Sequence, residues 1–294
     1  MGARDLGALV LLAALWGASY IFIRVAVPAL GPFVLMGARV TLASGALALY
    51  AVILAHGMPK FRARWKEFLI VGATNSAIPF TLIAAAEIEL TASLAAILNS
   101  TTALFVAVVA AVWIGESLTV MKVVGLLLGF AGVVMLVGWD PVQLNSAVLL
   151  AVGAMLAASL SYAVGGVYVK RTFAGVSPLA MTIGQQGAAA AILLPLAAAS
   201  LPGEAPPLPA ALSALALALL CTAVAYLLYF RLIENVGPTK TLAVTFLIPV
   251  FGLLFGVVLL DEPVGLGTIV GFAIISYGVA LVTEVRLGRG KEQA

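Results

Sequence analysis

Long apolar runs, separated by short polar or Pro/Gly-containing breaks, dominate this chain. Each run is about 20 residues long, the length that a helix needs to cross a bilayer. A transmembrane β-strand would instead alternate polar and apolar positions with a period of two. The pattern therefore predicts an all-α integral membrane protein with ten transmembrane helices. We expect these helices at residues 6–27, 32–55, 67–87, 91–114, 119–138, 146–169, 177–200, 208–230, 238–260 and 264–285.

The chain also resembles itself when it is shifted by 146 residues, which is close to half of its 294 residues. Gly7-Ala8 then aligns with Gly153-Ala154, and Gly132-Val133 aligns with Gly278-Val279. A repeat of this length is a duplicated domain, because solenoid units are much shorter. Five spans in each half is an odd number, so the second copy must cross the bilayer in the opposite sense. Two inverted five-helix repeats are typical of secondary transporters. We expect the first repeat at 1–140, the second at 147–286 and a cytoplasmic tail at 287–294.

Composition and charge agree with a membrane protein and set its orientation. Apolar residues make up 64% of the chain and charged residues 9%, whereas soluble domains carry about 25% charged residues. If both termini are cytoplasmic, 13 of the 15 Lys and Arg residues fall in cytoplasmic ends and loops. The remaining two, Arg24 and Arg39, lie within predicted spans. Cytoplasmic loops are enriched in basic residues, so this segregation predicts cytoplasmic N and C termini and accounts for the net charge of +3 without a nucleic-acid partner.

A Glu follows the fourth predicted span of each half, and glycines recur in the fifth. The two halves read Gly115-Glu116 … Gly125 … Gly132 and Asp261-Glu262-Pro263 … Gly271 … Gly278, with Trp16-Gly17 in the first span and Pro249 in the ninth. On these residues, and over nearly its whole length, the chain resembles the EamA-type ten-helix carriers of the drug/metabolite transporter (DMT) superfamily. The resemblance implies a transporter in the bacterial inner membrane that exports small metabolites, commonly amino acids, as exporters of the YddG type do.

Four residues are candidates for a gating or hinge role. Glu116 and Glu262 each stand just before the next predicted helix, where a carboxylate stabilises the positive end of the helix dipole. A structural role and a role in gating or coupling are both consistent with this position. Pro79 and Pro249 lie inside predicted spans, where a proline leaves one backbone carbonyl without its usual partner. That carbonyl could bind a ligand or simply mark a kink.

Glycines spaced three, four or seven residues apart form small-residue faces on the fifth and tenth predicted spans. Such faces allow helices to pack closely within a bilayer. The spacing is compatible with packing inside the chain or with a dimer interface, so the oligomeric state is left open. The glycines concerned are Gly125, Gly129, Gly132, Gly267, Gly271 and Gly278.

Inverted-repeat transporters bind their substrates near the middle of the membrane, between the repeats. Polar or aromatic character recurs at equivalent positions of the two halves: at the 146-residue offset Trp16 matches Tyr162, Ser76 matches Thr222, Phe80 matches Tyr226 and Asn99 matches Thr245. These pairs predict a shared central cavity. As an alternative, a Ser or Thr can bond its own helix backbone, and an aromatic residue can be an interfacial anchor. The candidate substrate-binding residues are Trp16, Ser19, Tyr20, Arg39, Ser76, Phe80, Asn99, Tyr162, Tyr226 and Thr245.

Arg39 is the one charge well inside a predicted span, and its counterpart in the second half is Gln185. An ionisable residue at such a depth suggests a function, here a contact with a substrate carboxylate or a gating ion pair. Structural pairing or snorkelling towards the interface is the alternative. Arg24, nearer the outer end of the first span, suits a structural or gating role.

Several functions lack the residues that they need. All twelve acidic residues fall in loops or near span ends, which disfavours a cation/proton antiporter. Glu87 and Glu89 lie at the outer end of the third span, either as solvated loop charges or as contacts for charged substrates. One His and one Cys, with no HExxH, GxSxG or Walker A sequence, provide no catalytic residues, no metal site and no cofactor site. We expect the partners to be a small-molecule substrate and the lipid bilayer.

Together these features predict a secondary transporter that exports small metabolites, amino acids foremost, by alternating access. An exporter of other small metabolites or of neutral drugs is the alternative within the same class. A channel or a membrane-embedded enzyme fits the duplicated halves and the missing catalytic residues less well.

Overall fold

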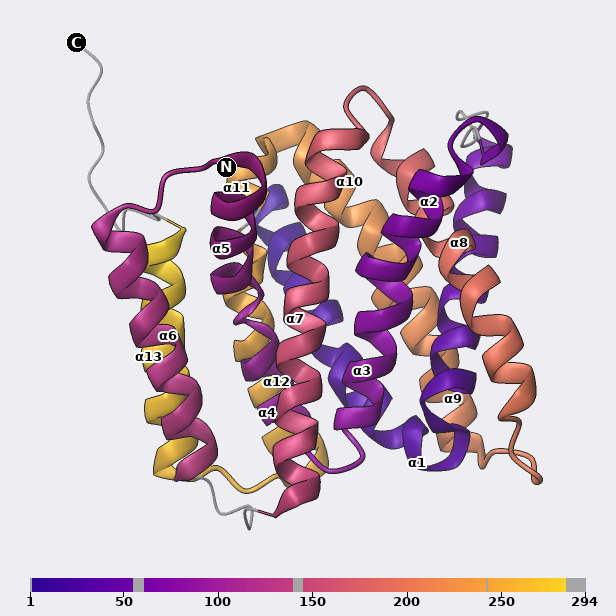
Figure 1. Cartoon of the computed structure of the whole chain (residues 1–294). Helices are drawn as coiled ribbons and strands as arrows, with labels where there is room; N and C mark the ends of the chain where they lie inside the picture. The colour runs from indigo at the N-terminus through magenta and orange to yellow at the C-terminus, as the bar shows by residue number, and fades with distance from the viewer. Residues whose placement is uncertain (1, 55–60, 140–144, 242, 284–294) are drawn as a thin grey trace.

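The computed structural model describes residues 2–54, 61–139, 145–241 and 243–283, and within these ranges the regular structure is helical, without a strand. Figure 1 shows the helices side by side in one bundle, with the N terminus and the C-terminal end of α13 (Leu266–Val282) at the same end. The all-α prediction is confirmed. Residue 55 of the second predicted span, residues 284–286 and the predicted tail 287–294 lie outside the described residues.

The first two predicted spans form one element, α1 (Ala3–Ile53), which is 51 residues long. Two helical segments meet inside it at Gly31, whose φ of 68° and ψ of 163° are not helical. Essentially only glycine adopts this region of backbone space. Pro28 and Pro32 flank this break, where the sequence predicted the boundary between the two spans.

The remaining spans of the first repeat include two that are interrupted. The third contains a π-helical turn at Ala73–Ala77, and the fourth is broken around residues 100–101. A short 3₁₀ turn at Phe61–Ala63 precedes them. The α-helices are α2 (Trp65–Gly72), α3 (Ile78–Ala86), α4 (Ala92–Asn99), α5 (Thr102–Ile114) and α6 (Val120–Gly138).

The second repeat shares a specific irregularity with the first. Its eighth span contains a π-helical turn at Leu219–Val224, which lies 146 residues beyond the turn at Ala73–Ala77. π-Helical turns are rare and are frequent at functional sites, so their recurrence at one offset is a specific match between the halves. The α-helices are α7 (Ser146–Thr172), α8 (Pro178–Ala199), α9 (Leu208–Ala218), α10 (Ala225–Val236), α11 (Pro238–Thr241), α12 (Val244–Leu260) and α13.

Helix length and composition support ten membrane crossings within the described residues. Seven helical stretches are long and apolar enough to span a membrane, and the two shorter apolar helices are α12 and α13. At 1.5 Å per residue, the 51 residues of α1 are about twice as long as one crossing requires. Counting α1 twice gives the ten transmembrane helices that the hydrophobic pattern predicts.

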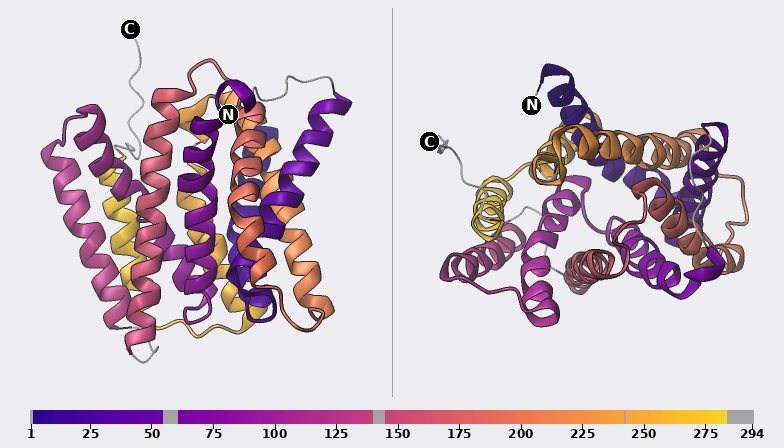
Figure 2. Two further views of the ribbon diagram at one scale, coloured as in Figure 1. Left: turned by 45° about the vertical axis from the view of Figure 1, so that its right-hand side comes forward. Right: turned by 90° about the horizontal axis from the view of Figure 1, so that it is seen from above.

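The glycine faces of α6 and α13 pack against each other within the chain, and Figure 1 and Figure 2 show the two helices side by side. A Cβ atom on Gly125 would lie 2.7 Å from the carbonyl oxygen of Gly278, and one on Gly278 would lie 2.6 Å from that of Gly125. Larger side chains at these positions would force the helices apart. Of the two interpretations that the spacing allowed, packing inside the chain is confirmed for this pair of helices.

Candidate substrate-binding site

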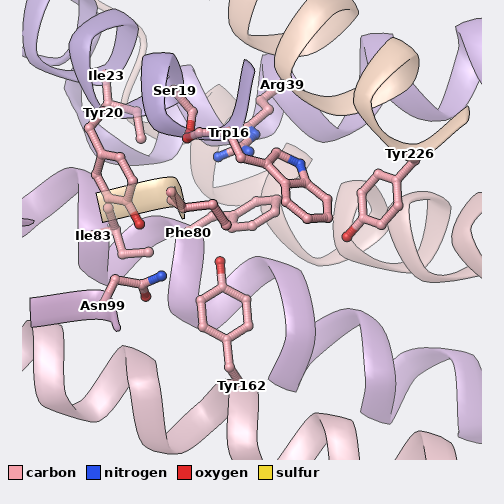
Figure 3. A pocket seen from close by; sticks show the side chains of 11 residues that line it. Trp16, Ser19, Tyr20, Ile23, Arg39, Phe80, Ile83, Asn99, Tyr162 and Tyr226 are labelled. Atoms are coloured by element: carbon pink, nitrogen blue, oxygen red, sulfur yellow. The ribbon is translucent and has the colours of Figure 1, made fainter. Parts of the chain in front are cut away.

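A cavity of about 180 Å³ lies among helices of both repeats, at α1, α3, α4, α7, α10 and α12 (Figure 3). Eight of the ten candidate residues line it: Trp16, Ser19, Tyr20, Arg39, Phe80, Asn99, Tyr162 and Tyr226. Three isoleucines that were not among the sequence candidates complete the lining: Ile23, Ile83 and Ile248. The candidates were chosen for polar or aromatic character, which isoleucine lacks. Helical spacing could have found all three, because Ile23, Ile83 and Ile248 stand three residues after the candidates Tyr20, Phe80 and Thr245.

The other two candidates, Ser76 and Thr245, lie outside this lining. Ser76 is fully buried in the π-helical turn, and its Oγ accepts a 2.8 Å hydrogen bond from Nε2 of Gln185 on α8. Thr245 lies in the first turn of α12, one turn before the cavity residue Ile248. The structure therefore gives Ser76 a partner in the neighbouring helix and does not place either residue on the cavity wall.

Aromatic rings form much of the cavity wall. Trp16 meets Tyr226 edge to face at 6.1 Å and Tyr229 at 5.4 Å between ring centroids. Phe80 meets Tyr162 edge to face at 6.3 Å. Figure 3 shows the Tyr162 hydroxyl pointing from α7 towards the middle of this group. The wall thus combines apolar ring faces with phenolic hydroxyls, which suits a small ligand with both apolar and polar parts.

Arg39 is the one charged residue of the cavity lining, and its side chain is only 7% exposed. Its Nε donates a 3.0 Å hydrogen bond to Oγ1 of Thr222, and its guanidinium carbon lies 3.8 Å from the centroid of the Phe80 ring. The Thr222 hydroxyl in turn donates to the carbonyl oxygen of Leu217 at 2.8 Å. Within the described part of the chain, Arg39 has no ion pair with a carboxylate.

The contact of Arg39 has a counterpart in the other half. At the 146-residue offset, Arg39 is equivalent to Gln185, and Thr222 is equivalent to Ser76. Gln185 and Ser76 also share a hydrogen bond. In both cases the donor lies in the second span of one repeat and the acceptor lies in a π-helical turn of the other. These two crossed contacts join the repeats beside the cavity and hold the polar side chains in place.

Two further polar residues of the cavity differ in how they are bonded. The Ser19 hydroxyl donates to the carbonyl oxygen of Trp16 in its own helix, so the local-backbone alternative holds for this residue. Asn99 ends α4, and its Oδ1 is buried without a hydrogen-bond partner among the described residues. Because a buried polar atom is normally paired, Asn99 leaves an acceptor available at the cavity.

Glu262 follows α12 and binds a helix of the other repeat. Its carboxylate accepts hydrogen bonds from the backbone N–H groups of Ala92 (2.7 Å) and Ser93 (2.9 Å) and from Oγ of Ser93 (2.5 Å). It therefore stabilises the first turn of α4. These hydrogen bonds agree with the structural alternative for Glu262, although the helix that it binds is a distant one and not the helix that follows it.

Glu116, the equivalent residue of the first repeat, binds Lys170 at the end of α7 at 2.7 Å. Both side chains are exposed, at 42% for Glu116 and 67% for Lys170. The hydrogen bond from Lys170 lowers the pKa of the Glu116 carboxyl. The following helix α6 is capped by Thr119, whose side chain accepts from the N–H of Lys122, so the structural and gating alternatives for Glu116 both remain predictions.

The other gating candidates and the charges after the third span also have defined places. Pro79 lies in the first turn of α3, directly after the π-helical turn, and Pro249 lies inside α12; both are buried.

Arg24 donates to the carbonyl oxygens of Glu87 and Ile88 at the C-terminal end of α3. Glu87 is fully buried and its carboxylate oxygens have no partner among the described residues, so a solvated loop charge is wrong for it. Glu89 is exposed.

Ten apolar crossings, a duplicated helical plan and a mixed aromatic and polar cavity between the halves define a multi-pass membrane carrier. The chain belongs to the EamA-like transporter family, whose sequence model matches it twice, at residues 6–138 and 149–284. The family resemblance of the sequence is thereby confirmed. The described residues contain no group of three or more His, Cys, Asp or Glu side chains placed to hold a metal ion.

Relatives of similar length include proteins named as transporters and as a probable exporter. The chain is 27% identical to the uncharacterized transporter YvbV of Bacillus subtilis, covering 93% of this chain and 90% of that protein. It is 28% identical to the uncharacterized inner membrane transporter YedA of Escherichia coli, covering 94% and 90%. It is also 28% identical to a probable terminal-alkyne amino-acid exporter of Streptantibioticus cattleyicolor, covering 99% and 97%.

The fold also matches a solved crystal structure with a TM-score of 0.69. The two chains are 20% identical, and the match covers 98% of this chain and 99% of the other. Because the identity is low, this match supports a shared fold over the entire chain and nothing about function.

Proposed function

We propose that this transporter exports small metabolites, amino acids foremost, across a bacterial inner membrane by alternating access. The observation that carries the proposal is the cavity between the repeats, whose wall offers Arg39, the Asn99 amide, tyrosine hydroxyls and aromatic faces within one small volume. An amino acid presents the matching groups: a carboxylate, an ammonium group and a side chain. The similarity to a probable terminal-alkyne amino-acid exporter supports this substrate class.

Alternating access is supported by the different states of equivalent residues at the two ends of the bundle. Glu262 is buried against the first turn of α4, whereas its counterpart Glu116 is exposed and bound to Lys170. Equivalent parts of inverted repeats exchange their environments when such a transporter changes state. Both termini are proposed to face the cytoplasm, in agreement with the distribution of basic residues.

The proposal is tested by counterflow in proteoliposomes. Purified protein is reconstituted into vesicles loaded with mixed unlabelled amino acids, and labelled Thr, Met or Phe is supplied outside. Accumulation of label above that in protein-free vesicles is the expected result. If the folded protein accumulates none of these three, they are not its substrates; the assay is then repeated with the other labelled amino acids, and failure of all of them rejects the amino-acid class and leads to tests of other metabolites and neutral drugs.

A further inference from the structure

The charge of Arg39 is not required by the contact that Arg39 makes with Thr222. At the equivalent position of the second repeat a neutral amide, Gln185, makes the same hydrogen bond to the equivalent acceptor Ser76. A glutamine would therefore be sufficient to join the repeats at position 39. A buried charge is costly unless it has a partner, so the guanidinium of Arg39 needs an explanation beyond this contact.

Among the described residues, the surroundings of Arg39 leave part of the guanidinium without a hydrogen-bond partner. Thr222 binds its Nε and the Phe80 ring covers one face, which fixes the orientation of the plane. Figure 3 shows the remaining nitrogens near Trp16 and Phe80, at the cavity. No described carboxylate lies within 4.0 Å of them, and no acidic residue lines the cavity. Glu87, the buried acid after α3, is not part of the lining.

We propose that Arg39 anchors the carboxylate of the transported solute, and that a free carboxylate, and not an ammonium group, is the feature that the site requires. This inference rests on the proposed transport function and specifies its substrate class. A guanidinium binds a carboxylate through two parallel hydrogen bonds. Thr222 and Phe80 act as positioning residues, because they hold the guanidinium with its open edge towards the cavity.

The cavity lining contains no acidic residue, so the ammonium group of an amino acid has no carboxylate partner there. An ammonium group meets only ring faces, hydroxyls and the Asn99 amide. Ring faces attract cations more weakly than a carboxylate partner would. Acids that lack the ammonium group, such as N-acetylated amino acids and 2-oxo acids with the same side chain, are therefore expected to bind about as well as the amino acid.

Competition against counterflow of labelled Phe tests this requirement on the wild-type protein. N-Acetylphenylalanine and phenylpyruvate should compete at concentrations within about threefold of unlabelled Phe. Phenylalanine methyl ester, phenylalaninamide and phenethylamine should need at least about tenfold more, since charge-assisted hydrogen bonds are lost. Competition by the ester or amide that equals that of the acids would overturn the carboxylate anchor while leaving the transport function intact. Absence of counterflow with any amino acid would instead reject the proposed function.

The variant Arg39→Gln separates the charge from the structural contact, because the amide can still donate to Thr222 as Gln185 does to Ser76. Its counterflow of Phe should fall by about tenfold to a hundredfold, and its preference for acids over the ester should disappear. The matched control Gln185→Ala removes the equivalent contact without removing a charge and should keep that preference. A folded Arg39→Gln protein that retains the preference for acids would contradict the inference.

Discussion

Nε of Arg39 donates to Oγ1 of Thr222 at 3.0 Å, across the boundary between the two repeats. The bond from Gln185 to Ser76 at 2.8 Å repeats this contact in the opposite direction. Each acceptor lies in a π-helical turn, and the two turns are related by the same offset as the donors. The inverted duplication thus brings four polar side chains to the middle of the bundle, where they join the halves beside the cavity.

This crossed arrangement explains why one cavity can be built from both repeats. The second span of each repeat is held against the third span of the other, and the wall residues Phe80 and Tyr226 lie a few residues after the π-helical turns. A π-helical turn contains one residue more than an α-helical path would and therefore rotates the next helical segment about its axis. The aromatic residues of both third spans consequently reach the same space.

Replacing Trp16 with Ala should weaken substrate binding without unfolding the protein. The ring contacts Tyr226 and Tyr229 and forms part of the cavity wall. Aromatic and cation–π contacts each contribute about 1 kcal/mol, so the KM for counterflow should rise by about fivefold to tenfold. Trp65→Ala, at an exposed ring that begins α2, is the control. An unchanged KM in Trp16→Ala would remove this residue from the site.

Asn99→Ala should reduce transport but leave the free energy of unfolding equal or slightly higher. The buried Oδ1 has no described partner, so its removal relieves an unsatisfied acceptor in the protein without substrate. With substrate bound, a hydrogen bond of about 1 kcal/mol is lost. Counterflow and thermal unfolding in detergent measure the two effects. Ser100→Ala is the control, because its hydroxyl bonds locally to the carbonyl of Ile97. If Asn99→Ala lowers the free energy of unfolding and Ser100→Ala does not, Asn99 has a structural role.

Much of the helix arrangement and of the cavity lining could be predicted from the sequence, because two sequence patterns are visible without knowledge of long-range contacts. Apolar run length marks the crossings, and the 146-residue offset marks equivalent positions. Trp16 with Tyr162, and Phe80 with Tyr226, were paired by this offset, and all four line the cavity. Polar or aromatic character at mid-span, present in both halves, was sufficient to select them.

The placement of Ser76 and Glu262 could not be predicted, for two different physical reasons. Ser76 lies in a π-helical turn, whose extra residue turns this side chain away from the cavity towards Gln185. No residue type in the sequence indicates where such a turn will form. Glu262 binds backbone N–H groups about 170 positions earlier in the chain, a partner that only the packed fold supplies. Local rules could place a carboxylate near a helix end but could not say which helix it would stabilise.

Gly31→Ala should destabilise the protein by about 1–3 kcal/mol. The backbone at Gly31, with φ of 68° and ψ of 163°, lies in a region that a residue with a Cβ atom occupies only under strain. Gly45→Ala is a matched control in the same element, because its added Cβ would have no atom within 4 Å and its backbone is helical. Thermal unfolding in detergent should show a loss for Gly31→Ala only. Equal stability of the two variants would mean that the break does not need a glycine.

Gly278→Ala should separate α13 from α6. The added Cβ would lie 2.6 Å from the carbonyl oxygen of Gly125 and 2.7 Å from the backbone N of Gly129, which are atoms that cannot move independently of the helix. Overpacking of this kind costs about 1–3 kcal/mol. Gly153→Ala, where a Cβ would meet nothing within 4 Å, should be neutral in the same unfolding assay. A neutral Gly278→Ala would show that the two helices can move apart freely.

The ion pair between Glu116 and Lys170 should make a small contribution to stability that depends on pH. The hydrogen bond from Lys170 lowers the pKa of Glu116 in the folded protein. The contribution is therefore fully present above the ordinary Glu pKa of the unfolded chain, about 4.3, and is lost as the pH falls through the lower folded value. Because both side chains are exposed, its size at pH 7 should be at most about 1 kcal/mol.

Comparing the free energy of unfolding of wild type with that of Lys170→Met at pH 7 and pH 3 measures this contribution. The difference should shrink at pH 3 and also at pH 7 in 1 M salt, which screens exposed charges. A difference that persists under both conditions would have to come from packing of the lysine stem and would exclude the ion pair as its source.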